Sequence, residues 1–275
     1  SLPVLESILF EVGTNNLTLR STNLDLGIEI KIPVKSEKEG RAAVPAKVVI
    51  SYLNNIKDGE KLVFETTEGV LNIHSKLSQV SINTIPNEDF PVIPQIDAED
   101  VFTIKSKDLV GGLKAVVYAS SISSMKPELS SVYMFKDEND LVFVATDSFR
   151  LAEKRIPAND VKLESGILIP FKNALEIMRV CEDAPGEIEV MFNKNQLSVS
   201  FENVYMVSRV VDGVFPDYGQ IIPKEFTTTI TALKQDVLNS FKVINIFSDK
   251  FNQVQVLMNP EEKQFTISTK NNSVG

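Results

Sequence analysis

The sequence predicts an α+β protein built from three copies of one domain. Two observations lead to this fold class: strand-like segments far outnumber amphipathic helices, and the chain matches itself when it is shifted by 124 residues. At that shift Leu17–Pro33 aligns with Leu141–Pro157, and both segments end in Ile-Pro. This period is too long for a solenoid repeat of roughly 20–50 residues and has the size of a domain. Each copy is therefore expected to bury its own core.

Further matches extend the repeat. Phe90-Pro91 aligns with Phe215-Pro216 at a shift of 125, and Phe265–Thr269 aligns with Leu17–Ser21 at 248, twice the first shift. Three complete copies would be longer than the 275 residues of the chain. The first copy is therefore expected to lack its start and the third to contain only its first part, so that the chain is a fragment or an incompletely covered protein.

Most of the predicted elements are strands, because runs of alternating or β-branched apolar residues recur along the chain. In order they are Lys61–Phe64, Val70–His74, Gln79–Ile85, Val132–Phe135, Leu141–Ala145, Ile188–Phe192, Leu197–Phe201, Tyr205–Val211, Phe226–Thr231 and Val254–Met258.

Four short amphipathic helices are expected between these strands, at Ala46–Ile56, Lys107–Tyr118, Phe171–Cys181 and Lys234–Phe247. Pro45 and Pro170 precede the first and third helices, a position that proline favours, and Ser106 is expected to cap the second. This pattern is typical of α+β domains in which antiparallel sheets carry helices on one face.

The predicted domains are residues 1–98, 99–224 and 225–275, of which only the second is complete. The linkers between them are expected near Pro94–Asp100 and Pro223–Glu225, each just after a turn that contains Phe-Pro.

Composition excludes several kinds of site. Cys181 is the only cysteine and His74 the only histidine, so an internal disulfide framework, a cysteine-rich zinc site, a histidine metal cluster and a Ser-His-Asp triad are excluded. Cys181 lies on an apolar helical face and is expected to be a buried thiol. The chain has 43% hydrophobic residues but no apolar run near the roughly 18 residues of a membrane span.

An enzymatic function would need a catalytic centre that the sequence does not supply. Asp147-Ser148 with Glu153, Asp212 and Asp217 provides carboxylates for a Mg²⁺ site, but nothing in the spacing fixes their geometry. No phosphate-binding GxxxxGK[ST] loop, no HExxH motif and no base for a serine nucleophile is present. We expect no catalytic residue, no metal and no cofactor, which favours a binding protein.

The predicted helices carry a basic stripe on the side opposite their apolar face. Residues spaced i, i+4, i+7 there include one acid, Glu176, and six basic residues: Lys47, Lys107, Lys114, Lys172, Arg179 and Lys242. The stripe is basic although the chain carries a net charge of −9. A solvated helix surface would explain one such stripe, but its recurrence in three repeats favours contact with a phosphate backbone, without sequence readout.

Several motifs, in order along the chain, resemble those of the bacterial β sliding clamp, the processivity subunit of DNA polymerase III. Val144–Ala152, VATDSFRLA, is similar to the family signature VATD-G/S-H/Y-RLA, and Val211–Tyr218 followed by Ile221–Pro223 is similar to the second signature. Four shorter segments also fit: Leu2–Leu5, Val44–Lys47, Asp89–Pro91 and Asp249–Phe251.

The resemblance implies a head-to-tail homodimer in which six similar clamp domains close a ring. Antiparallel sheets would form the outside, and helices would line a central pore for double-stranded DNA. Lys126, on the loop Ser120–Glu128, would join the basic stripe near DNA. The protein would be a non-catalytic accessory subunit in the cytoplasm, associated with the nucleoid and not with a membrane.

The resemblance also implies a hydrophobic pocket that binds short peptide motifs of partners. Those partners are the DNA polymerase III alpha subunit, the clamp-loader delta subunit, other DNA polymerases and repair proteins. Carried over by position, the pocket residues are Leu129, Thr146, Ser148, Phe149, Arg150, Leu151, Pro216, Gln220, Ile221 and Phe251. Without the resemblance, Leu129, Leu151, Ile221 and Phe251 would be interpreted as ordinary core residues.

The implied ring interface joins the first domain of one copy to the third domain of the other. Val80 and Ile82, expected on an outward strand, would meet Ile246 and Phe247 at the end of the last predicted helix. In a monomer these four residues would belong to the core. The alternative function is a three-domain scaffold that recruits proteins without encircling DNA.

Overall fold

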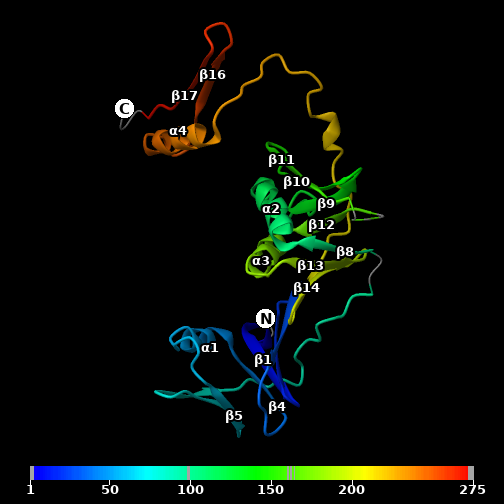
Figure 1. Ribbon diagram of the computed structural model, residues 1–275, viewed down its shortest axis with the longest axis vertical. Helices are drawn as coiled ribbons and strands as arrows, with labels where there is room; N and C mark the ends of the chain where they lie inside the picture. The colour runs from blue at the N-terminus through cyan, green and yellow to red at the C-terminus, as the bar shows by residue number, and fades with distance from the viewer. Residues whose placement is uncertain (1–2, 98–99, 160, 162, 164, 272–275) are drawn as a thin grey trace. The chain divides into compact units, whose positions relative to one another are not determined.

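A computed structural model of the chain describes residues 3–97, 100–159, 161, 163 and 165–271 (Figure 1). The chain forms two compact units, Ser1–Pro216, here called unit 1, and Asp217–Gly275, here called unit 2.

Unit 1 contains an eight-stranded antiparallel sheet in the order β4-β1-β2-β3-β15-β14-β13-β8. A short 3₁₀ helix, Pro3–Glu6, precedes it. At its centre β3 pairs with β15, and Ile28 lies opposite Met206, so segments nearly 180 residues apart share one sheet. The strands are β1 (Ser7–Gly13), β2 (Asn16–Thr22), β3 (Leu26–Pro33), β4 (Gly40–Pro45), β8 (Asp100–Lys105), β13 (Glu187–Phe192), β14 (Gln196–Phe201) and β15 (Val204–Arg209).

Two smaller antiparallel sheets complete unit 1. One has the order β11-β10-β9-β12 and the other β5-β6-β7. Their strands are β5 (Val63–Thr67), β6 (Val70–His74), β7 (Gln79–Asn83), β9 (Ser131–Asp137), β10 (Asp140–Thr146), β11 (Leu151–Pro157) and β12 (Ile167–Pro170). β5 begins two residues later than predicted, because the turn at Glu68-Gly69, where both φ angles are positive, sets Val63 opposite His74.

The sequence repeat is a structural repeat in unit 1. The order β11-β10-β9-β12 reproduces β3-β2-β1-β4 from the first repeat. An isolated bridge recurs as well: Ile85 donates its N–H to the Ala43 carbonyl at 2.8 Å, and Val211 donates to the Leu168 carbonyl at 2.8 Å. We therefore number the two copies as the first and second repeat.

Each repeat of unit 1 buries its own core, as expected. In the first repeat Phe10, Leu71 and Ile73 are buried together, and a small neighbouring cluster contains Phe90. The second repeat has a larger core that includes Phe143 and Cys181. Cys181 is buried as predicted, and burial raises the pKa of its thiol to about 11.

Three helices of unit 1 begin close to their predicted starts: α1 (Ala46–Leu53), α2 (Ser106–Val116) and α3 (Phe171–Cys181). Pro45 and Pro170 are the N-cap residues of α1 and α3. The prediction that Ser106 caps α2 is wrong, because Ser106 is the first helical residue and Lys105 occupies the cap. The Ser106 hydroxyl instead donates to the carbonyl of Cys181 at the end of α3, which ties the two helices together.

α1 and α2 are shorter than predicted. α1 ends at Leu53, and α2 passes at Val117 into the 3₁₀ helix η2 (Val117–Ala119). In Figure 1, α1 lies to the left of β1 and β4, and α2 and α3 lie to the left of β8 and β13. The helices of unit 1 thus share one side, as the α+β prediction requires.

Unit 2 contains η3 (Tyr218–Gln220), α4 (Lys234–Ile246) and the hairpin β16 (Gln255–Asn259)–β17 (Gln264–Ser268). The prediction of a strand at Phe226–Thr231 is wrong, since no strand forms there. The equivalent strand of the second repeat, β8, is held by β13. Among the described residues of unit 2 no such partner strand follows the hairpin, and a lone strand leaves its backbone groups unpaired.

Candidate functional site

The β10–β11 turn, which carries the family-like signature, is a tight hydrogen-bonded structure. Thr146 accepts the Ser148 N–H at 3.1 Å through Oγ1 and donates its hydroxyl to the Arg150 carbonyl at 2.8 Å. Asp147 Oδ1 accepts the N–H groups of Phe149 and Arg150, each at 3.0 Å. These bonds hold Ser148 at a φ of 76°, a left-handed conformation that is uncommon for serine.

The first repeat builds the same turn between β2 and β3. Thr22 accepts the Leu24 N–H at 3.0 Å and donates to the Leu26 carbonyl at 2.8 Å. Asn23 Oδ1 accepts the N–H groups of Asp25 and Leu26 at 3.0 and 2.8 Å, and Leu24 has a φ of 75°. Aspartate and asparagine oxygens serve equally well in such turns, so the 124-residue match reflects one conserved piece of geometry.

Asp147 and Arg150 also form an ion pair. Arg150 Nε lies 3.0 Å from Asp147 Oδ2. The backbone N–H groups of Arg150 and Phe149, together with the charge of Arg150, hold the pKa of the Asp147 carboxyl below its usual value. Asp147 is therefore a turn-forming carboxylate. Among the described residues, no three His, Cys, Asp or Glu side chains are grouped so that they could hold a metal ion.

The predicted pocket residues of unit 1 differ widely in exposure. Leu129 and Thr146 are buried and Leu151 is half-buried, whereas Ser148, Arg150 and Pro216 are exposed and Phe149 is 97% exposed. Leu129 is thus a core residue of the isolated unit. The four signature residues Thr146, Ser148, Phe149 and Arg150 meet in the β10–β11 turn.

The remaining predicted pocket residues belong to unit 2. Gln220 donates its amide to Asp217 Oδ2 at 2.8 Å. Ile221 is 69% exposed and Phe251 is 68% exposed. Interpreting Ile221 and Phe251 as core residues is therefore wrong for this structure.

The candidate DNA-facing residues are all exposed: Lys47 on α1, Lys107 and Lys114 on α2, Lys126 on the loop after η2, Lys172 and Arg179 on α3, and Lys242 on α4. Two have acidic neighbours, because Lys114 lies 4.0 Å from Glu182 and Arg179 lies 3.6 Å from Glu176. Ion pairs this exposed are weak. The helices thus present basic groups to solvent on an acidic chain.

The candidate interface residues divide into two groups. Ile246 and Phe247, at the end of α4, are 73% and 47% exposed. Ile82 is buried and Val80 packs, half-buried, against the same core, which agrees with the interpretation of these two residues as core residues of a monomer. Period-two alternation placed both residues on one face of the strand but did not determine which face is covered.

Sequence reasoning missed one residue beside the signature turn. Tyr118, in η2, lies with its ring centroid 5.8 Å from Cζ of Arg150. The sequence placed Tyr118 at the end of a predicted helix, and no local pattern connects it to position 150.

Two family models match the chain: the N-terminal domain of the DNA polymerase III beta subunit over residues 1–94, and the central domain of that subunit over residues 103–217. Together the two matches cover well over half of the chain. Residues 95–102, between the two matches, are covered by neither of them.

Curated relatives and solved structures agree with these models. The Beta sliding clamp of Synechococcus elongatus is 24% identical over 280 residues, covering 99% of this chain and 75% of the relative. That of Rickettsia bellii is 26% identical over 250 residues, covering 89% and 66%. The chain spans 62–75% of the length of these and the other most similar curated relatives.

Among solved structures, the beta subunit of Streptococcus pyogenes DNA polymerase matches with a TM-score of 0.88 and 22% identity, covering all of this chain and 75% of that one. The DNA polymerase III subunit beta of Pseudomonas aeruginosa matches with a TM-score of 0.86 and 22% identity, covering 98% and 76%. These likenesses show that the fold is the sliding-clamp fold. No helix within the described residues is long and apolar enough to cross a membrane. The chain belongs to the DNA polymerase III beta subunit family, the bacterial β sliding clamps, which are non-catalytic processivity factors of DNA replication.

Proposed function

We propose that the protein forms a head-to-tail ring with a second copy, that the ring encircles double-stranded DNA, and that it slides without reading sequence. The ring would tether the DNA polymerase III alpha subunit and bind the clamp-loader delta subunit, other DNA polymerases and repair proteins through short peptide motifs. It would work in the cytoplasm at the nucleoid. The three domains would be residues 1–98, 99–224 and 225–275.

The observation that carries the ring proposal is the joint between β3 and β15. In this joint a strand from the end of the second repeat pairs with a strand from the first repeat. The counterpart of β15 in the first repeat is β7, since Val80 and Ile82 match Met206 and Ser208 at a shift of 126. Met206 and Ser208 are both buried.

β7 has one partner, β6, and its other edge is unpaired among the described residues. A free sheet edge is a template for a further strand. In the observed joint, the last strand of the second repeat pairs with a strand of the repeat before it. If β7 is paired in the same way, its partner strand comes from the domain that precedes the first domain. That domain can only belong to another copy of the protein. Repeating the same joint head to tail closes a ring. Val80 and Ile82 would then lie at the interface in the way that Met206 and Ser208 do in the observed joint.

The charge distribution supports DNA as the content of the ring. The exposed basic residues of α1, α2, α3 and α4 stand on a chain with a net charge of −9. Such a distribution favours DNA at the helices and repels it elsewhere. Contacts with phosphates alone are independent of sequence and sensitive to salt. Weak contacts of this kind would centre a duplex that the ring itself retains.

The signature turn supports a partner-binding surface. It presents an exposed aromatic ring, Phe149, beside an exposed arginine, Arg150, on a rigid hairpin. Apolar and aromatic anchors with a few polar groups are typical of peptide sites. The P. aeruginosa sliding clamp has been solved with griselimycin bound, which supports a ligand-binding surface on this fold.

The ring proposal is tested with full-length protein and an Ile246→Arg/Phe247→Arg variant, because both side chains are exposed and their replacement spares the cores. We expect the unaltered protein to have the mass of a dimer and slow hydrogen exchange along β7. The variant is expected to be a monomer with fast exchange there. An unaltered protein that is a monomer with fast exchange along β7 would contradict ring closure and favour the scaffold that does not encircle DNA.

A further inference from the structure

Three side chains from two separate segments of unit 1 meet at the signature turn. Arg150 extends from the turn, Asp147 precedes it by three residues, and Tyr118 comes from η2 at the end of α2. The Arg150 guanidinium lies over the Tyr118 ring, with Cζ 5.8 Å from the ring centroid. Its Nε donates to Asp147 Oδ2 at 3.0 Å.

These contacts restrict the guanidinium in two directions. Asp147 binds the inner nitrogen, Nε, and Cζ lies over the ring of Tyr118, within the roughly 6 Å over which a cation is attracted to an aromatic ring. Among the described residues, no acceptor is hydrogen-bonded to the two terminal nitrogens of Arg150. A planar guanidinium held in this way presents two parallel donors in a fixed direction.

The local charge indicates which group these donors would bind. The Asp147 carboxylate, 3.0 Å from Arg150 Nε, already neutralises the charge of Arg150. The chain as a whole is acidic, with a net charge of −9. A neutral acceptor, such as a main-chain carbonyl oxygen of a peptide, therefore suits this arginine better than a second carboxylate.

We propose that Tyr118 is a positioning residue of the partner-binding surface: its ring holds Arg150 so that the terminal nitrogens bind main-chain carbonyl oxygens of a partner peptide. This inference rests on the proposed partner-binding function. Phe149, 97% exposed and adjacent in the turn, supplies apolar contact to the same peptide. Tyr118 itself is 61% exposed, so it adds little to the core, and its replacement tests the site without unfolding the domain.

A double-mutant cycle distinguishes an effect of Tyr118 that acts through Arg150 from an effect that is independent of Arg150. The full-length protein, Tyr118→Ala, Arg150→Ala and the double variant are compared for affinity to the DNA polymerase III alpha subunit, with Tyr118→Phe as the matched control. An exposed cation–π contact implies that Tyr118→Ala weakens binding about two- to fivefold. Tyr118→Phe keeps the ring and should bind like the unaltered protein. In the Arg150→Ala background, Tyr118→Ala should cause no further loss.

A second measurement does not depend on any partner. The Tyr118 ring should shift the NMR signals of the Arg150 side chain, and this shift should be lost in Tyr118→Ala but kept in Tyr118→Phe. The positioning role is overturned if the signals do not move, or if Tyr118→Ala weakens binding equally with and without Arg150. If the unaltered protein does not bind the alpha subunit, the proposed partner function itself fails, and this inference fails with it.

Discussion

Two adjacent glycines of α2 should respond in opposite ways to alanine. Gly112 is buried, and a Cβ atom there would lie 2.6 Å from Cδ2 and 2.8 Å from Cζ of Phe143. The best carbon–carbon separation is roughly 3.5–4.0 Å, and Phe143 is completely buried on β10, so its ring has no free space to enter. Gly111 has no atom within 4 Å of the added Cβ.

The comparison isolates the packing cost. Alanine in place of glycine favours a helix interior by about 1 kcal/mol, and this gain is nearly the same at neighbouring positions. Overpacking a core costs about 1–3 kcal/mol and applies only to Gly112→Ala. We therefore expect Gly111→Ala to raise the free energy of unfolding. The free energy of unfolding of the Gly112→Ala protein should be about 1–3 kcal/mol lower than that of the Gly111→Ala protein.

Urea unfolding followed by far-ultraviolet circular dichroism measures this difference. The chain contains no tryptophan, so the signal comes from the backbone. A Gly112→Ala protein at least as stable as Gly111→Ala would refute the close packing of α2 on the second-repeat sheet.

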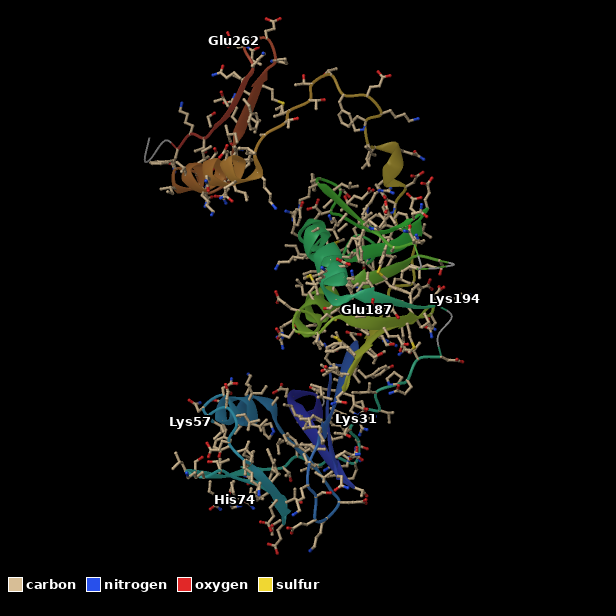
Figure 2. The ribbon with its side chains drawn as sticks, in the orientation of Figure 1. Lys31, Lys57, His74, Glu187, Lys194 and Glu262 are labelled. Carbon is tan, nitrogen blue, oxygen red and sulfur yellow. The ribbon has the colours of Figure 1, made fainter. Side chains whose placement is uncertain are left out.

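Three further predictions follow from the site. Asp147 has a lowered pKa because it accepts backbone N–H groups, so its contribution to turn stability is present above the ordinary pKa of 3.8 and lost as pH falls below it. NMR signals of the Phe149 and Arg150 amides should report this loss. Asp147→Asn should abolish the pH dependence of these signals while keeping the turn, because Asn23 builds the same turn in the first repeat. An unchanged titration in that variant would contradict the assignment of the pH dependence to Asp147. Burial raises the pKa of Cys181 to about 11, so maleimide labelling at pH 8 should be slow in native protein and fast in urea, whereas fast native labelling would contradict its burial. Lys172→Ala should reduce the slope of log affinity against log salt for a short duplex by about 0.9 if the lysine neutralises one phosphate. Lys194 lies on the opposite side of unit 1 from α2 and α3 (Figure 2), so Lys194→Ala should leave the slope unchanged. Equal slopes for both variants would contradict the assigned DNA face.

Local chemistry made part of the structure predictable. Thr22 and Thr146 recur at the same place in the repeat, and the hydroxyl of each builds the same turn by hydrogen bonds to backbone groups two and four residues away. Pro45 and Pro170 mark helix starts because proline fixes its own φ and needs no N–H partner there. The basic residues of the helix stripes are exposed because they lie opposite the apolar face.

Contacts between distant segments were not predictable from one sequence. The hydroxyl of Ser106 binds a carbonyl 75 residues away in place of its own helix end. Ile82 shares a core with Val49 of α1 and Leu71 of β6, a contact that alternation within β7 does not reveal. Phe226–Thr231 has strand-like composition, but strand formation requires a partner strand. Tyr118 meets Arg150 only through the packing of α2 against β10 and β11.

The most direct measurement of the central claim is retention of the full-length protein on nicked circular DNA after loading, before and after the circle is cut once. A sliding ring holds DNA by topology, so the protein should stay on the intact circle through a high-salt wash and leave rapidly once the DNA is linear. Loss from both forms, or salt-dependent binding that is indifferent to the cut, would contradict the ring and leave a scaffold that binds DNA only through its surface charge.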